Sequence, residues 1–166
     1  MSTSSEVSPG DATRFGVLSC KPVLMGRARD KVGIITAPAV PVPREPKLPG
    51  ILLFDAGLIH RAGPHRLNVQ VARHAAGLGF TSVRFDFAGI GDSPPRATSE
   101  SFEEGSIRDA IEVMDFVSAV RGIDRFVAIG LCSGADVSLE LASRDPRVVG
   151  AILIDAYSYE TPLYLA

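Results

Sequence analysis

Apolar runs that look like strands alternate with amphipathic helical segments over residues 50–155, and this alternation constrains the fold most. Residues 50–55 form a continuous apolar run, which is typical of a strand buried on both faces of a parallel sheet. Consecutive parallel strands need crossover connections, which are almost always right-handed and place helices on the sheet faces. The predicted fold class is therefore α/β, a mostly parallel sheet with helices on both faces.

The elements upstream of residue 50 differ from those downstream. Residues 14–48 predict an antiparallel hairpin at one sheet edge, and residues 1–13 predict a disordered tail before one domain at 14–166. Five prolines between Pro38 and Pro49 predict an extended surface connection. Strands are predicted at residues 32–36, 50–55, 82–87, 126–130 and 148–155, and helices at residues 66–79, 103–121 and 133–143.

Composition excludes several classes of protein. Of the 166 residues, 46% are hydrophobic and 22% charged, which allows a sizeable core and excludes a disordered chain. The net charge of -2 offers no basic field, so neither nucleic acid nor a membrane is an expected partner. Two cysteines do not make a disulfide framework, and no leader-like or spanning apolar segment is seen. We therefore expect a cytoplasmic protein.

The run GLCSG at residues 130–134 places a cysteine between two glycines, where a predicted strand meets a predicted helix. This is the G-x-nucleophile-x-G spacing of a nucleophile elbow, with cysteine where serine is usual. Centring the motif on Ser133 would put Leu131 and Ala135 where glycines are needed, so the register favours Cys132. A thiol at a helix N-terminus is expected to react as the thiolate. The alternative is a tight turn with a buried, inert cysteine.

Two runs upstream complete a pattern. GILLFDAGLI at residues 50–59 places a glycine just after a buried strand, and RFDFAGIGDS at residues 84–93 has the form R-x-D-x-x-G-x-G-x-S. Together with the elbow, they resemble the α/β-hydrolase superfamily over residues 23–157. Within this superfamily, the chain is similar to bacterial hydrolases associated with exopolysaccharide and exosortase loci. The runs that carry this similarity are GLIHRAGPHR, RFD-x-x-GxGDSPPR and GLCSGA.

The resemblance implies an ester, thioester or amide hydrolase acting on a small-molecule acyl substrate through Cys132. The backbone N–H groups of Leu58 and Ser133 match the oxyanion donors, which stabilise negative charge on the carbonyl oxygen. Asp86 and its neighbouring glycines match loop-shaping positions. No residue set has metal-ligand spacing, so neither a metal nor a cofactor is predicted. Arg61 and Arg66 are expected to be solvated loop charges.

The chain also departs from the superfamily, which has a histidine base after the last strand and an acid before that histidine. Its three histidines, His60, His65 and His74, all precede the candidate nucleophile. The chain therefore resembles the N-terminal two-thirds of a hydrolase, without the cap and the last strands. Asp155 is a candidate acid, or else a turn residue. His60 is a candidate substitute base, or else a loop histidine with local hydrogen bonds.

Two functions follow from these observations. The first is acyl hydrolysis through an acyl-Cys132 intermediate. The second is a non-catalytic role, in which a pseudo-hydrolase or fragment binds an acyl ligand or a partner. Residues 148–155 are apolar, without lysine or proline, and are expected to form an edge strand. Such edges pair with other chains, so a homo-oligomer or a second chain covering this strand is expected.

Overall fold

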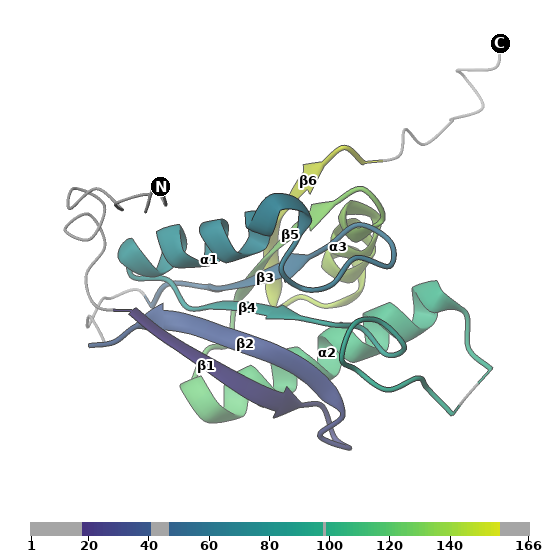
Figure 1. Ribbon diagram of the computed structural model, residues 1–166. Helices are drawn as coiled ribbons and strands as arrows, with labels where there is room; N and C mark the ends of the chain where they lie inside the picture. The colour runs from purple at the N-terminus through teal and green to yellow at the C-terminus, as the bar shows by residue number, and fades with distance from the viewer. Residues whose placement is uncertain (1–17, 41–46, 98, 157–166) are drawn as a thin grey trace, which may run out of the picture.

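The computed structural model describes residues 18–40, 47–97 and 99–156, which form a six-stranded sheet with helices on both faces (Figure 1). The strands are β1 (Leu18–Met25), β2 (Lys31–Pro38), β3 (Gly50–Phe54), β4 (Ser82–Phe85), β5 (Phe126–Leu131) and β6 (Val148–Ile154). The helical elements are the 3-10 turn η1 (Pro64–Arg66) and the helices α1 (Leu67–Gly77), α2 (Phe102–Arg121) and α3 (Ser133–Arg144). The predicted tail at 1–13, most of the proline segment and the end of the chain lie outside the described residues.

The sheet order is β1-β2-β4-β3-β5-β6. Strands β4, β3, β5 and β6 are parallel to one another, whereas β1 and β2 form an antiparallel hairpin whose β2 pairs antiparallel with β4. This arrangement confirms the predicted fold class, including the edge hairpin. Strand β1 continues through Pro22, which an outer strand tolerates because no described strand pairs with one side of its backbone.

Alternate residues of β3 divide the core into two layers. Leu52 and Phe54 belong to the cluster beneath α2 and α3. Ile51 and Leu53 belong to the smaller cluster beneath α1. Because successive strand residues point to opposite faces, a strand covered by helices on both sides must be apolar throughout. All five residues of β3 are buried, as the sequence predicts.

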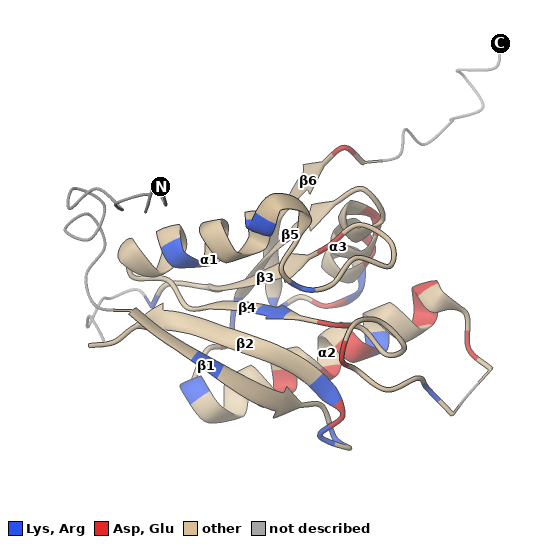
Figure 2. Ribbon diagram, in the orientation of Figure 1, with Lys and Arg blue, Asp and Glu red and all other residues tan. Residues whose placement is uncertain are grey.

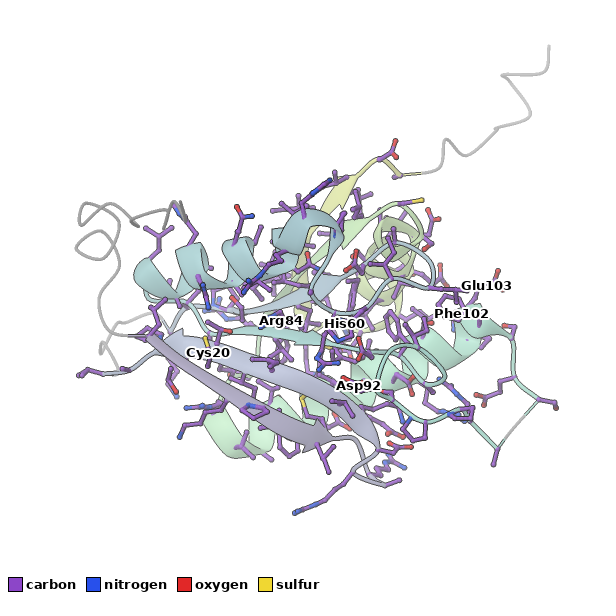
Figure 3. The ribbon with its side chains drawn as sticks, viewed as in Figure 1. Cys20, His60, Arg84, Asp92, Phe102 and Glu103 are labelled. Atoms are coloured by element: carbon purple, nitrogen blue, oxygen red, sulfur yellow. The ribbon has the colours of Figure 1, made fainter. Side chains whose placement is uncertain are left out.

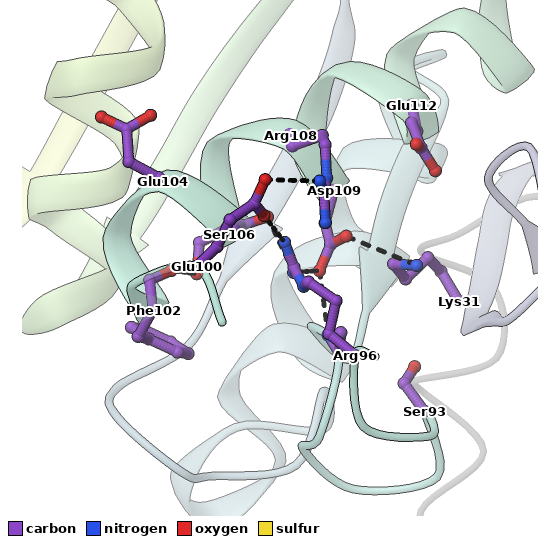
Figure 4. A network of polar contacts seen from close by, with 12 residues as sticks. Lys31, Ser93, Arg96, Glu100, Phe102, Glu104, Ser106, Arg108, Asp109 and Glu112 are labelled. Carbon is purple, nitrogen blue, oxygen red and sulfur yellow. Dashed lines mark hydrogen bonds and ion pairs between the residues drawn. The ribbon is translucent and has the colours of Figure 1, made fainter. Parts of the chain in front are cut away.

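A buried carboxylate ties three elements together beneath α2 (Figure 4). Asp109 of α2 is 1% exposed. Its Oδ1 lies 3.4 Å from Nζ of Lys31 at the start of β2, and its Oδ2 lies 2.6 Å from Nη2 of Arg96. The Ala88 N–H also donates to Oδ2, at 2.9 Å. Burial raises the pKa of Asp109, against the opposing effect of these donors and cations. The network fixes the loop after β4 against α2.

Replacing Asp109 with alanine should lower the free energy of unfolding by about 3–5 kcal/mol, because Lys31 and Arg96 then lose their buried counter-charge. Urea unfolding measures the loss. Asp115→Ala is the matched control: Asp115 is half exposed and pairs with Arg147 at 2.8 Å. An exposed pair contributes about 1 kcal/mol or less. Equal losses in the two variants would contradict the network's proposed importance.

Among the helices of the described residues, none combines the length and the apolar character that a membrane span requires.

Candidate functional site

Cys132 occupies the sharp turn between β5 and α3, in a backbone conformation that side chains rarely adopt. Its φ is 51° and its ψ is -120°. Positive φ at a residue other than glycine is strained and persists only where surrounding contacts enforce it. Here the Cys132 N–H donates to the Ile154 carbonyl at 2.8 Å, and the Cys132 carbonyl accepts from the Ala135 N–H at 2.8 Å. The half-buried cysteine is thus fixed by β6 on one side and α3 on the other.

The two glycines of the GLCSG run are required by close backbone packing. A Cβ on Gly130 would overlap the backbone carbonyl of Gly134. A Cβ on Gly134 would lie 2.6 Å from the Asp55 carbonyl oxygen and 2.9 Å from that of Phe54. The first glycine therefore lets the turn fold over itself, and the second lets α3 begin directly against the end of β3.

The loop after β3 is joined to the elbow by a hydrogen bond. The Gly57 N–H donates to Ser133 Oγ at 2.6 Å. The Ala56 carbonyl accepts from the Ile59 N–H at 3.0 Å, so Gly57 and Leu58 are the central residues of a tight turn. Leu58 is 84% exposed. The structure thus brings together the two segments that carry the predicted oxyanion donors, Leu58 and Ser133.

Asp55 also lies in the site, although the sequence pattern predicts only that it ends a strand. Its Oδ1 accepts from the Ala56 N–H at 3.0 Å, and its Oδ2 accepts from Asn68 Nδ2 at 3.3 Å. Burial raises the pKa of Asp55, although the backbone N–H groups of Ala56 and Gly63 and the nearby His60 oppose the shift. One carboxylate therefore links the start of the loop to the start of α1. The sequence feature that could have indicated this role is an acidic residue directly after a fully apolar strand.

His60 lies on the same loop and faces Asp92 (Figure 3). Its Nε2 is 3.6 Å from Asp92 Oδ2, and its Nδ1 accepts from the Ala62 N–H at 3.2 Å. Its side chain is 45% exposed. The polar contacts that the structure shows for His60 are thus with its own loop and with Asp92, and neither is with Cys132.

The expectation that Arg61 is a solvated loop charge is wrong. Its side chain is only 12% exposed and forms an ion pair with the fully buried carboxylate of Asp86. Its backbone N–H donates to Asp86 Oδ1 at 2.7 Å, and its Nη2 lies 2.8 Å from Asp92 Oδ2. The physical reason is that a carboxylate buried beside β4 requires a charge partner, and the loop supplies one. Arg66 is exposed, as expected.

The same cluster has the form of a possible cation site. One ligand atom each from His60, Asp86 and Asp92 lies within 4.8 Å of the other two. The cation within this group is the Arg61 guanidinium, which contacts both carboxylates. A Cβ on Gly91 would overlap the Asp86 carboxylate, so this glycine makes room for the ion pair. The cluster therefore serves to hold the two loops together.

Asp155 follows the last residue of β6, at the same end of the sheet as the elbow. Its φ is 53°, and it is exposed. The preceding residue, Ile154, accepts the hydrogen bond from Cys132. The position is consistent with a turn residue, and its role as an acid stays a prediction.

Comparisons with known proteins agree with this fold. The esterase Pf2001 of Pyrococcus furiosus superposes with a TM-score of 0.65 at 14% identity, over 93% of this chain and 54% of that protein. GrgF, an α/β hydrolase of Penicillium sp. sh18, gives 0.65 at 17% identity, over 84% of this chain and 46% of GrgF. A cold-adapted esterase from an Arctic intertidal metagenomic library gives 0.60 at 23% identity, over 82% of this chain and 59% of that esterase.

The chain thus spans about half the length of these solved structures. None of the curated proteins matches its sequence significantly. A family described as having the alpha/beta hydrolase fold matches residues 49–164, which is well over half of the chain. The chain belongs to the α/β hydrolase fold family.

Proposed function

We propose that this chain is an acyl hydrolase of the ester, thioester or amide type, with Cys132 as its nucleophile. The observation that carries the proposal is the strained backbone of Cys132 between two sterically required glycines. Such strain clusters at functional sites, where it presents a reactive side chain. The two free cysteines, Cys20 and Cys132, support a reducing, cytoplasmic location. The resemblance to hydrolases of exopolysaccharide and exosortase loci stays a prediction.

The proposed reaction has two covalent steps. The Cys132 thiolate attacks the carbonyl carbon, and the carbonyl electrons move onto oxygen, where the N–H groups of Leu58 and Ser133 stabilise the negative charge. The carbonyl re-forms as the bond to the leaving group breaks, and the leaving group takes a proton from solvent. Water then attacks the thioester, which releases the carboxylic acid, regenerates the thiolate and returns one proton to solvent. The Gly57–Ser133 hydrogen bond holds the two proposed donors in position.

The second step needs a base, and the contacts of His60 do not place it on Cys132. General base catalysis contributes about 10²–10⁴-fold to such reactions. We therefore expect acylation without efficient turnover: one p-nitrophenol released per chain from p-nitrophenyl acetate, then a rate near background. Cys132→Ala should abolish both this burst and the acyl adduct seen by intact-protein mass spectrometry.

Cys20 is the matched control, because it is an exposed free thiol in the same chain. Iodoacetamide should label Cys132 about tenfold faster than Cys20 near pH 7. Cys20→Ala should leave the burst unchanged. Sustained turnover that is lost in both Cys132→Ala and His60→Ala would instead identify His60 as a working base.

The second candidate function is a non-catalytic module that binds an acyl ligand or a partner. It is favoured by the fixed contacts of His60 and by the exposure of Asp155. The same experiment distinguishes the two functions. Labelling of Cys132 no faster than Cys20, with no acyl adduct, would support the binding module and refute the proposed nucleophile.

A further inference from the structure

Arg84 of β4 is a buried charge whose Nε–H has no protein acceptor in the described part of the chain. It is 9% exposed. A buried charge is costly unless it is paired. Either the folded protein bears an unusual free-energy cost at this position, or a ligand supplies the missing negative charge.

A second unsatisfied polar group lies on the same face of the strand. Ser82 precedes Arg84 by two residues, so both side chains point to one side of the sheet. Its Oγ is fully buried and has no hydrogen-bond partner among the residues that the structure describes. Opposite Ser82 on β2 lies Thr36, whose hydroxyl donates a long hydrogen bond of 3.8 Å to Cys20 Sγ. Figure 3 shows Arg84 and Cys20 below α1.

The strand register shows that the side chains of Ser82 and Arg84 lie on the face of the sheet that α1 covers. Arg84 pairs with Leu53 of β3 in the parallel ladder, and Leu53 packs against Ala72 and Ala75 of α1. Arg84 therefore lies beneath the helix layer formed by α1, at the side of the sheet where β2 continues outward.

The surroundings of Arg84 are positively charged. Burial lowers the pKa of Arg84, Cys20 opposes this effect, and the neighbouring Arg61, Arg73 and Arg66 lower the pKa further. Helix α1 and strands β1, β3 and β4 contain no acidic residue, and Figure 2 shows the basic residues of α1 and β4 without acidic ones among them. Asp86, two residues beyond Arg84, is occupied by Arg61. The nearby carboxylate is therefore committed elsewhere.

We propose that Arg84, Ser82 and Thr36, together with Arg73 and Arg66 of the α1 layer, form a binding site for a phosphate group. The buried guanidinium and the two hydroxyls supply donors, and the two exposed arginines supply further positive charge. Arginine is suited to this ligand because its planar guanidinium binds phosphate in a bidentate manner. The site uses none of the residues proposed for acyl transfer, so either proposal can fail without the other.

The test is titration of the full chain with inorganic phosphate at constant ionic strength, with chloride as the reference anion. We expect phosphate to raise the thermal midpoint and to bind with one site per chain in calorimetry. Arg84→Met should weaken phosphate binding by about tenfold or more, the loss expected for a charged hydrogen bond. Without phosphate, Arg84→Met should have a higher midpoint than the parent chain, because it removes an uncompensated buried charge.

Two further variants keep the test decisive. The double variant Arg66→Gln/Arg73→Gln changes only exposed residues and should also weaken phosphate binding. Arg121→Met, at the exposed end of α2, should leave phosphate binding unchanged. No phosphate response in the parent chain, or an Arg84→Met midpoint below that of the parent chain, would overturn the proposal. The second result would mean that Arg84 is stabilised by its contacts within the protein.

Discussion

Replacing Gly130 with alanine should lower the free energy of unfolding by about 3 kcal/mol or more, at the upper end of overpacking effects. The added Cβ would overlap backbone atoms of Gly134 and Ala135, in the first turn of α3. A flexible side chain could rotate away from such a contact, but backbone cannot. The turn must therefore open, and the strained geometry of Cys132 should relax. Urea unfolding measures the loss of stability, and a change in the rate of iodoacetamide labelling of Cys132 shows whether the turn has opened.

Gly150→Ala is the matched control. Gly150 lies in β6, and the nearest atom to an added Cβ is Val127 Cγ2 at 3.8 Å, an ordinary van der Waals contact. Where a glycine's conformation suits alanine, the substitution is typically stabilising by about 0.4–1 kcal/mol. If Gly130→Ala were as stable as Gly150→Ala, the steric account of the elbow would be wrong.

The second large effect concerns association through β6. One side of β6 pairs with β5, and the sheet order places no described strand on its other side. Val149, Ile152, Leu153 and Ile154 remain substantially exposed. Unpaired backbone groups and apolar side chains on one strand are a template for another chain. We propose that a second copy of the chain pairs here, so sedimentation velocity should show dimers or larger species at about 10–50 μM protein.

Ile152→Lys/Leu153→Lys places a charge on each face of β6 and should shift the chain to monomer, because charged residues block edge pairing. Leu78→Lys, an equally exposed apolar position beyond the end of α1, should leave association unchanged. A monodisperse parent chain over this concentration range would refute self-association. Residues 157–166, which follow β6, lie outside the described part of the chain.

The sequence was sufficient for features that depend on local periodicity or on steric rules. The five apolar residues of β3 predict a doubly buried strand, and they are buried on both faces. The spacing of Gly130 and Gly134 around Cys132 predicts a turn too tight for side chains, and the structure gives the contacts responsible. Such rules need no knowledge of what lies far away along the chain.

Interactions between distant residues were not predictable in the same way. Arg61 and Asp86 are 25 residues apart, and only the packing of two loops shows that they neutralise each other. The sequence likewise places Arg84 in an apolar strand without showing which charges surround it. Asp55 illustrates the same limit, because its significance depends on Asn68 at the start of α1.

The hydrogen bond from the Cys132 N–H to the Ile154 carbonyl has a consequence for how the chain responds to its surroundings. It connects the candidate nucleophile directly to the last residue of the exposed strand β6. Any strand that docks on β6 and shifts Ile154 therefore changes the free energy of the strained turn. Such coupling is reciprocal. If docking on β6 changes the free energy of the turn, a modification of the thiol that relaxes the turn changes the affinity of β6 for its neighbour. Assembly and the reactivity of Cys132 would then be thermodynamically coupled.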